Sequence, residues 1–362
     1  MDLATWRYLR PIYEAVPRDP AGFELVIQKS AQGGASILSL LFVLWLALRG
    51  RYQIAYFLPT QAHALAFSTN RFIRLARENK AIHRLMGDPE TPHARRVVDE
   101  GSASVRRLLS SIIYFTFMGG KITTEALPLD SLVLDEVQEM GLAEIQKAEE
   151  RISASPLRTI LRVSTPNWEQ SDINFFFQQS DQRWFHTRCN CPDGIVLAEA
   201  WDPKLGPLCI GKGNGTTPGI PVEPFYRCPR CDTIIEDPQE GEYIARNPGA
   251  KAVGFHFPQM LSPRQTAGDI LEKWERRVDT ATFYRRVLGR PYTDPDTQPV
   301  TEAHLSNAQN PDLRWGPPKR DQHDGVFMGV DQMGGDNRAV LVGRQYGSSR
   351  MRLLHLEAMP VT

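Results

Sequence analysis

A glycine-rich loop is the first group of residues whose types and spacing suit chemistry. Gln28–Ser36 (QKSAQGGAS) lies between an apolar run that suits a strand and an apolar helical pattern that begins at Ile37. In such a loop, backbone N–H groups and the dipole of the following helix form a cradle for a phosphate. Ala35 replaces the lysine that precedes the final hydroxyl residue of a standard P-loop. Taken alone, Gly33-Gly34 is equally well explained by a tight turn.

Two adjacent carboxylates form the second group. Leu132–Glu136 (LVLDE) is an apolar run that ends in Asp135-Glu136. At the carboxyl end of a strand, Asp135 can help to hold Mg²⁺ while Glu136 polarises the water that attacks ATP. An isolated pair of this kind is often only a helix N-cap with an acid in the first turn. Together with the glycine-rich loop, the pair favours an ATPase.

Two shorter segments each follow an apolar run, in positions where motor proteins carry functional motifs. Ser164-Thr165-Pro166 occupies the position where helicase-like motors carry a small hydroxyl motif that links the γ-phosphate to movement of the DNA-gripping parts. Leu58–Gln61 (LPTQ) has the same kind of position after an earlier run. Each segment by itself also fits an ordinary strand-to-loop turn.

Four of the five cysteines form two close pairs, a C-x-C and a C-x2-C separated by 36 residues. They are Cys189, Cys191, Cys228 and Cys231. Four thiolates in two pairs match a closed tetrahedral Zn²⁺ site, which stabilises a segment without a core of its own. Because C-x-C is the less usual spacing, His186 or Cys209 is an alternative ligand. Free buried cysteines are the other interpretation.

A late acidic strand suits a nuclease. Val326–Arg344 reads as a strand that carries Asp331, a glycine turn and a second strand, which is how an RNase H-like nuclease opens. Asp331 would be the first of several carboxylates around two metal ions. Asp336 and Glu357 are nearby acids, and the remaining carboxylates would lie on later strands. We therefore expect ATP hydrolysis without DNA cleavage from this form; the alternative is that Asp331 is a hairpin acid with no catalytic duty.

Phosphoryl transfer also uses an arginine finger, often from a neighbouring subunit in ring motors. The candidates are Arg106, Arg107 and Arg158. Ordinary surface charges are the alternative for each. Nearer the carboxyl end of the chain, three more arginines are candidates for contact with phosphates: Arg285, Arg286 and Arg290. A solvated helix face explains them equally well.

The elements that must position these residues alternate between short apolar runs and longer helical patterns. This alternation is typical of strands joined by crossover helices in a mainly parallel sheet, and nearly continuous apolar runs suit strands covered on both faces. We therefore predict an α/β fold. The predicted strands are Phe23–Gln28, Gln53–Leu58, Ile112–Phe117, Ser131–Leu134 and Thr159–Val163.

Beyond these strands the pattern changes. A stretch rich in proline, glycine and cysteine runs from about Gln182 to Asn247 and indicates a metal-stapled insert. Ala267–Leu288 predicts one charged amphipathic helix, which Gly289 and Pro291 end. After a polar connector, three more strands are predicted at Val326–Asp331, Arg338–Arg344 and Met351–Leu356.

The bulk composition fits a compact enzyme of two or three domains, with 362 residues of which 41% are hydrophobic. Lys+Arg and Asp+Glu are both 42, so any contact with DNA must be local. The amino-terminal residues lack an apolar core of signal-peptide length, which favours the cytosol. Ile37–Leu48 carries no charge, but 12 residues are too few to cross a bilayer, so we predict a buried helix.

The order of these motifs resembles the lambda-type, GpA-like family of bacteriophage large terminase subunits. The order is QKSAQGGAS, LPTQ, LVLDE and STP, followed by a cysteine-rich insert and a late Gly-Val-Asp. In that family the Walker A lysine can sit at the start of the loop. The resemblance therefore implies that Lys29 binds phosphate and that Ser36 is a Mg²⁺ ligand. Gln32 stands where such terminases often place arginine.

The resemblance implies a RecA/P-loop-like ATPase core, a zinc-ribbon-like insert and the start of an RNase H-like nuclease domain. It implies a motor that uses ATP, Mg²⁺ and Zn²⁺ to move double-stranded DNA into the procapsid. The implied partners are a small terminase subunit and the portal protein, with a homo-oligomeric ring in the host cytoplasm, transiently docked on the procapsid, and no membrane. The implied ATP-binding residues are Lys29, Ser30, Gln32, Gly33, Gly34, Ala35 and Ser36.

The expected division of the chain follows from these parts. The ATPase core covers 1–181, the insert 182–247, the rest of the ATPase domain 248–290, the connector 291–324 and the incomplete nuclease domain 325–362. Two alternatives stay open. A superfamily-2-type helicase or DNA-remodelling ATPase would need a second RecA-like lobe with an arginine finger after Ser164. A zinc-ribbon DNA adaptor with an inactive ATPase fold would explain why Ala35 replaces the usual lysine.

Overall fold

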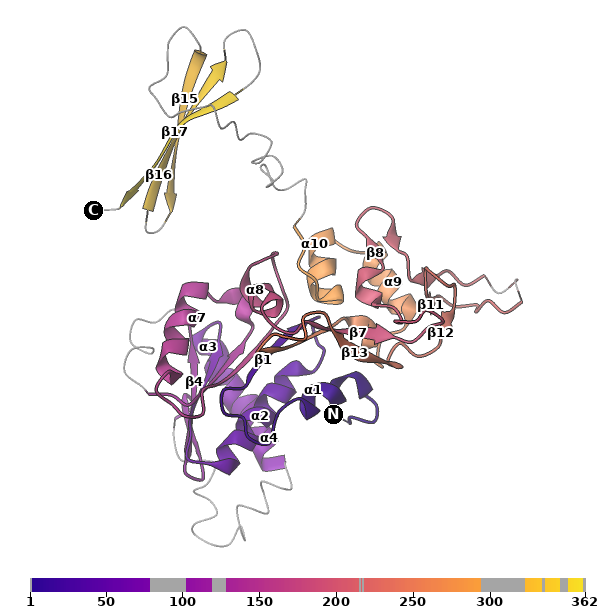
Figure 1. Ribbon diagram of the computed structural model, residues 1–362, viewed down its shortest axis with the longest axis horizontal. Helices are drawn as coiled ribbons and strands as arrows, with labels where there is room; N and C mark the ends of the chain where they lie inside the picture. Colours follow the sequence, from indigo (N-terminus) through magenta and orange to yellow (C-terminus); the bar gives the residue numbers. More distant parts are fainter. Residues whose placement is uncertain are drawn as a thin grey trace. The chain divides into compact units, whose positions relative to one another are not determined.

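The chain forms two compact units, Met1–Asp294 and Pro295–Thr362. The computed structural model describes residues 2–78, 102–118, 128–214, 216, 218–293, 323–333, 336–345 and 351–360. Figure 1 shows the first unit as a sheet with helices and the second as a group of three strands. Each unit is described by itself below.

A nine-stranded sheet organises the first unit, in the order β13-β7-β14-β1-β6-β5-β2-β4-β3. Its strands from β7 to β4 pair in parallel, while β13 and β3 pair antiparallel at the two edges. The strands are β1 (Glu24–Lys29), β2 (Gln53–Leu58), β3 (Val105–Leu108), β4 (Ser111–Phe117), β5 (Ser131–Asp135), β6 (Thr159–Ser164), β7 (Arg183–Thr187), β13 (Gly241–Ala245) and β14 (Val253–Phe257).

Helices cover both faces of this sheet, as Figure 1 shows. One core holds residues of η1 (Arg7–Leu9), α1 (Arg10–Glu14), α2 (Ala35–Arg49), α3 (Gln61–Phe67), η2 (Ser68–Phe72) and α4 (Ile73–Glu78). The other holds residues of η3 (Val137–Glu139), α7 (Leu142–Glu149), η4 (Glu150–Ile152) and α8 (Asp172–Gln178). Leu132 and Leu134 of β5 enter the second core and Val133 enters the first. Burial on both faces explains why the strand is apolar throughout.

The five predicted strands of the parallel core are confirmed, each within one residue of its expected ends. The predicted buried helix at Ile37–Leu48 is also confirmed, as α2. In the residues that the structure describes, no helix is both long and apolar enough to span a membrane.

The prediction of one helix over Ala267–Leu288 is wrong. The segment forms α9 (Ala267–Glu275), α10 (Thr280–Phe283) and the π-helical turn η7 (Tyr284–Leu288). The break occurs because Asp279 adopts an extended conformation and its side chain accepts a 2.6 Å hydrogen bond from the N–H of Thr282. An aspartate N-cap of this kind starts a new helix.

The cysteine-rich stretch contributes to the main sheet at both of its ends, through β7 and β13. Between these strands lie only short elements, which gather near α9 (Figure 1). They are η5 (Leu197–Glu199), β8 (Trp201–Asp202), β9 (Gly206–Pro207), β10 (Ile210–Gly211), β11 (Phe225–Arg227) and β12 (Ile234–Ile235). A last 3-10 turn of the unit, η6 (Gln259–Leu261), follows β14. The chain thus leaves the sheet after β7 and returns to it at β13.

The second unit is a three-stranded antiparallel sheet with the order β15-β16-β17. Its strands are β15 (His323–Met333), β16 (Asp336–Gln345) and β17 (Met351–Pro360). They contain the three predicted strands of this part of the chain. Asp331 of β15 pairs with Arg338 of β16, and Glu357 of β17 pairs with Ala339.

Candidate nucleotide site

The glycine-rich loop joins β1 directly to the amino end of α2. Gly34 is the N-cap of α2 with φ of 80°, and Gln32 has φ of 59°. A Cβ atom on Gly33 would lie 2.4 Å from Cε2 of Phe257, so only glycine fits against this ring. The loop therefore presents backbone N–H groups at a helix amino terminus, which suits an anion such as phosphate.

Two polar side chains are buried where the loop begins. Lys29, the last residue of β1, is 5% exposed and Ser30 is fully buried. The hydroxyl of Ser30 has no hydrogen-bond partner among the residues that the structure describes. A buried ammonium and an unpaired hydroxyl at the start of the loop are suited to bind a ligand with several acceptor atoms.

Asp135 ends β5 and is almost fully buried. Its Oδ2 accepts a 2.7 Å hydrogen bond from the phenol of Tyr56, and its Oδ1 has no partner among the described residues. Burial raises the pKa of Asp135, while Lys29, Tyr56 and Ser36 act in the opposite direction. A buried carboxylate with one unpaired oxygen, which Ser36 also approaches, fits a Mg²⁺ ligand set, because Mg²⁺ prefers oxygen ligands.

Glu136 follows Asp135 in a left-handed conformation, with φ of 64° and ψ of 48°. Its Oε2 accepts a 2.6 Å hydrogen bond from the side-chain amide of Gln138. The hydroxyl of Ser164 accepts a 3.0 Å hydrogen bond from the N–H of Gln138 and also contacts the side-chain oxygen of Gln138. One glutamine therefore connects the carboxylate of Glu136 with the hydroxyl segment after β6.

The rest of that segment continues the connection. The carbonyl of Thr165 lies 2.7 Å from the hydroxyl oxygen of Ser164 and competes with the side-chain oxygen of Gln138 for the one hydroxyl proton. After Pro166, the side chain of Asn167 donates to the carbonyl of Gln138 at 3.3 Å. The segment is thus packed around the turn that holds Glu136.

A pocket of about 610 Å³ is lined by some of these groups, while Lys29, Ser30 and Ser164 lie outside its lining. Ser36, Asp135, Glu136 and Gln138 line it, and so do Pro59 and Thr60 of the second hydroxyl segment. These residues follow β1, β5 and β2 or begin the next helix, so the pocket lies at the carboxyl edge of the parallel strands. That edge is where α/β sheets bind their ligands.

The carboxyl-terminal turns of the first unit hold the loop in place. The N–H of Ala31 donates a 2.8 Å hydrogen bond to the carbonyl of Arg286. The side chain of Gln28 donates to the carbonyl of Gly289 at 3.0 Å, and His256 donates from Nε2 to the carbonyl of Leu288 at 3.0 Å. The loop thus depends on residues more than two hundred and fifty positions away in the chain.

The predicted arginine fingers lie away from the pocket. Arg158 directly precedes β6, at the amino edge of the sheet, and Arg106 and Arg107 are on the edge strand β3. The side chain of Arg106 is buried and its Nε donates to the hydroxyl of Ser68 at 2.9 Å. The arginines that do line the pocket are Arg71 and Arg286. Of these, only Arg286 was a candidate for phosphate contact from the sequence.

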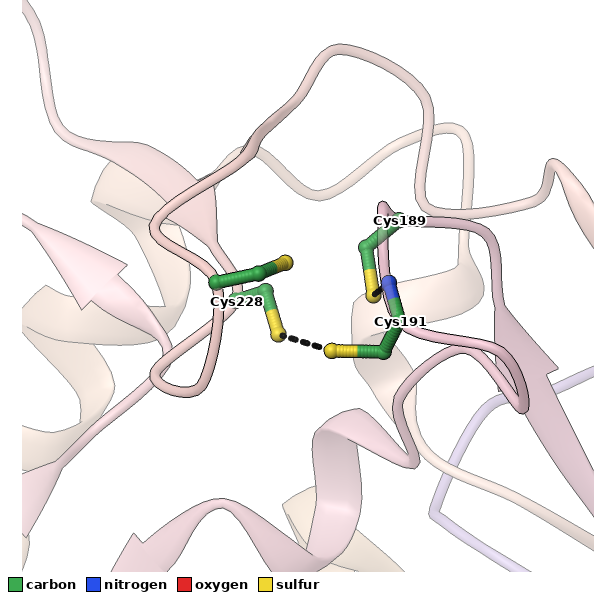
Figure 2. A group of neighbouring side chains, drawn as sticks. Cys189, Cys191 and Cys228 are labelled. Carbon is green, nitrogen blue, oxygen red and sulfur yellow. Dashed lines mark hydrogen bonds between the residues drawn. The ribbon is translucent and has the colours of Figure 1, made fainter.

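The four paired cysteines come together in space. Their sulfur atoms all lie within 4.8 Å of one another, although the two pairs are far apart in the sequence. Figure 2 shows Cys189 and Cys191 on one loop facing Cys228 on another. The sulfur atoms of Cys191 and Cys228 are 3.8 Å apart. Tetrahedral Zn–S bonds of about 2.3 Å place two sulfurs roughly 3.8 Å apart, so the spacing fits such an ion.

The cysteines of the cluster differ in how readily they lose a proton. Hydrogen bonds from Thr233 lower the pKa of Cys231 to about 6. Burial and the contact with Cys231 raise the pKa of Cys191 to about 12. A cation among the four sulfur atoms would lower the pKa of each thiol, because an opposite charge at short range favours the thiolate form.

The alternative ligands do not join the cluster. Cys209 is fully buried and its sulfur lies 3.8 Å from the carbonyl of Leu197. The Nδ1 atom of His186 lies 2.7 Å from the carbonyl of Asp193. Among the residues that the structure describes, the four paired cysteines are the group of three or more Cys, His, Asp or Glu side chains that lie close enough to hold one metal ion.

Comparison with known proteins gives the chain its family. The family model described as "Phage terminase large subunit gpA, ATPase domain" matches residues 1–248. No curated protein matches the chain. The large terminase of a thermophilic bacteriophage is similar in structure, with 12% identity, a TM-score of 0.41 and coverage of 99% of this chain and 67% of that one.

The same terminase in complex with ADP gives 11% identity, a TM-score of 0.40 and coverage of 99% and 67%. The large terminase ATPase domain of Thermus phage P74-26 gives 16% identity, a TM-score of 0.42 and coverage of 78% and 93%. Because all three TM-scores are low, the family assignment rests on the sequence match, which spans more than two thirds of the chain. The chain belongs to the phage terminase large subunit gpA family and is an ATPase of phage DNA packaging.

Proposed function

We propose that this protein is a motor that uses ATP hydrolysis to move double-stranded DNA into a procapsid. The observation that carries the proposal is that Ser36, Asp135 and Glu136 line one pocket, with Glu136 hydrogen-bonded through Gln138 to Ser164. This arrangement brings together groups suited to bind phosphate, to bind a metal ion and to activate water. It also connects them to a segment that can report the state of the nucleotide.

The residues of the glycine-rich loop have defined roles in this proposal. The backbone N–H groups of Gln32, Gly33, Gly34 and Ala35 surround the phosphates, and Lys29 supplies a positive charge beside Asp135. The hydroxyl of Ser30 is available as a further donor. Ser36 and Asp135 hold Mg²⁺, which neutralises charge on the phosphates when bound.

Glu136 acts on the water that attacks the γ-phosphate. Its Oε2 accepts the amide of Gln138, so the carboxylate has a fixed orientation and its other oxygen can accept a proton from water. Ser164, Thr165 and Pro166 form the coupling segment. A change at the γ-phosphate that moves Glu136 would pull on Gln138 and therefore on Ser164.

We propose that Cys189, Cys191, Cys228 and Cys231 bind one structural Zn²⁺. The part of the chain that they join contains only short strands, which the ion would cross-link. The stretch 182–247 carries seven Lys or Arg against nine Asp or Glu. This balance does not favour an adaptor that binds DNA phosphates directly.

The remaining roles extend the same proposal. The first unit acts with double-stranded DNA, a small terminase subunit and the portal protein, as a homo-oligomeric ring in the host cytoplasm that docks on the procapsid. The divisions 1–181, 182–247, 248–290, 291–324 and 325–362 stand as proposed domains. Asp331 is a metal-binding carboxylate of an RNase H-like nuclease domain in this proposal.

The helicase alternative requires a second RecA-like lobe. The parallel strands that the structure describes form one sheet, and the other described sheets have two or three strands and are antiparallel. The packaging motor therefore has the stronger support.

ATP hydrolysis by the full chain, measured with and without double-stranded DNA, tests the proposal. We expect DNA to stimulate hydrolysis and Glu136→Gln to abolish turnover while nucleotide binding remains. The control Glu144→Gln changes an acid of α7, outside the pocket lining, and should leave the rate unchanged. Turnover at the wild-type rate in Glu136→Gln would overturn the assignment.

A further inference from the structure

The nucleotide pocket has an unusual balance of charge. Three carboxylates line it, from Asp135, Glu136 and Glu139. Among the described residues, the arginine and lysine side chains in its lining are those of Arg71 and Arg286. A triphosphate beside three carboxylates needs nearby cations, because like charges repel strongly at short range in a site that is partly shielded from water. The two arginines are therefore candidates for contact with phosphate.

Arg286 is fixed to the phosphate loop through its backbone. Its carbonyl accepts the N–H of Ala31, the residue before Gln32. Three residues later, a Cβ atom on Gly289 would lie 2.7 Å from the N atom of Ser30, so this turn packs directly on the loop. The position of Arg286 is thus set by the same loop that holds the phosphates.

The side chain of Arg286 is exposed and makes no hydrogen bond or ion pair with the residues that the structure describes. Its two neighbours differ. Arg285 donates to the carbonyl of Tyr292 at 2.8 Å and lies over the ring of Trp168, and Arg290 donates to the carbonyl of Ala198 at 3.2 Å. Of the three arginines in this segment, Arg286 is therefore the one with its guanidinium available in the pocket.

Arg71 has a different setting. It lies on η2 with its guanidinium 5.6 Å from the centroid of the Phe67 ring. Arg71 and Arg286 lie on turns from separate segments of the chain. Of the two, Arg286 is the one whose backbone carbonyl binds the N–H of Ala31 in the loop. This contact favours Arg286 as the partner of the phosphates in the loop.

We propose that Arg286 binds the terminal phosphate of ATP in its own subunit. The inference rests on the proposed nucleotide site. A guanidinium can donate two parallel hydrogen bonds to phosphate oxygens and stabilises charge in the transition state. Position 32 of the phosphate loop is a neutral glutamine. In this role Arg286 supplies a positive charge to the phosphates from the end of the ATPase unit.

The test compares Arg286→Gln with Arg71→Gln and with Arg276→Gln in the full chain. Arg276 is an exposed arginine at the end of α9, paired with Glu272, and serves as the matched control. We expect Arg286→Gln to lower kcat by about 10- to 100-fold and to weaken binding of ATPγS more than binding of ADP. By the same reasoning, Arg276→Gln should stay within about 2-fold of wild type. A wild-type kcat and ATPγS affinity in Arg286→Gln would overturn the proposal, and a loss confined to Arg71→Gln would transfer the role to Arg71.

A rescue variant separates contact with phosphate from a role in folding. Gln32 follows Ala31, whose N–H binds the carbonyl of Arg286, so an arginine at position 32 would return a positive charge to this part of the loop. We expect Gln32→Arg to recover at least part of the rate in the Arg286→Gln background, whereas a purely structural loss would not recover. The Glu136→Gln variant is the independent control for the proposed function: if it still hydrolyses ATP, the site assignment fails, whatever Arg286 does.

Discussion

The side-chain amide of Gln138 donates a 2.6 Å hydrogen bond to Oε2 of Glu136. The same glutamine binds the hydroxyl of Ser164 through its N–H at 3.0 Å and contacts it through its side-chain oxygen. The side-chain nitrogen of Gln138 thus binds Glu136, and its side-chain oxygen lies against the hydroxyl of Ser164. This makes Gln138 a positioning residue between the proposed water-activating group and the coupling segment.

Gln138→Leu should lower kcat by about 10-fold or more and leave KM for ATP nearly unchanged, because the side chain holds Glu136 rather than the nucleotide. Steady-state ATP hydrolysis with and without DNA checks this expectation. Gln146→Leu, on α7, is the control. A rise in KM with an unchanged kcat would show that Gln138 serves binding instead.

A small substitution at Gly33 should affect both stability and nucleotide binding. Gly33→Ala places a methyl group 2.4 Å from Cε2 of the buried Phe257, so either the ring or the loop must move. We expect a loss of about 1–3 kcal/mol in the free energy of unfolding, together with weaker nucleotide binding. Denaturant unfolding and nucleotide titration measure the two effects.

The control for this substitution is Gly249→Ala, where the added methyl group meets no atom within 4 Å. Replacing Phe257 by leucine in the Gly33→Ala background should recover part of the nucleotide affinity by making space beside the loop. If Gly33→Ala binds nucleotide with wild-type affinity, the close packing of the loop on Phe257 is not needed for nucleotide binding.

The fold was predictable where burial leaves a mark on the sequence. β5 and β2 are covered on both faces, so their apolar runs were visible without any knowledge of their neighbours. β7 and β14 contain charged, histidine or glycine residues and flank a stretch rich in proline and glycine. Nothing local shows that such short segments return to the sheet, because their pairing is decided by distant strands.

The site was predictable to the same extent. Asp135 and Glu136 stood out because a motif of adjacent residues ends a strand, whereas Tyr56 is 79 positions from Asp135 and carried no signal of its own. The role of Gln138 depends on β6 lying beside β5, which is a property of strand order. Arg286 was one of three similar arginines until their contacts distinguished them.

The buried histidine behind the phosphate loop should make stability depend on pH. Burial, and to a smaller degree the nearby Arg290, lower the pKa of His256 to about 3. The unfolded chain, with an ordinary histidine pKa near 6.5, therefore binds more protons between about pH 6.5 and 3. Stability contributed by neutral His256 is present above this window and is lost as pH falls through it.

His256→Gln should remove that part of the pH dependence, because glutamine does not titrate and its amide can still donate to the carbonyl of Leu288. Melting temperatures of both proteins between about pH 7.5 and 5 check this prediction. We expect the wild type to lose more stability than the variant on acidification. Parallel curves would mean that His256 does not control acid stability.

The cysteine cluster gives a prediction that is independent of nucleotide. If the four sulfurs within 4.8 Å of one another hold Zn²⁺, the purified chain should contain about one zinc per molecule by elemental analysis. Cys231→Ser should lose the metal and lower the melting temperature, because the short strands between β7 and β13 then lack their cross-link. Cys209→Ala is the matched control, since Cys209 lies outside the cluster and faces the carbonyl of Leu197. Full zinc content in Cys231→Ser, or loss of zinc in Cys209→Ala, would contradict the ligand set derived from the geometry.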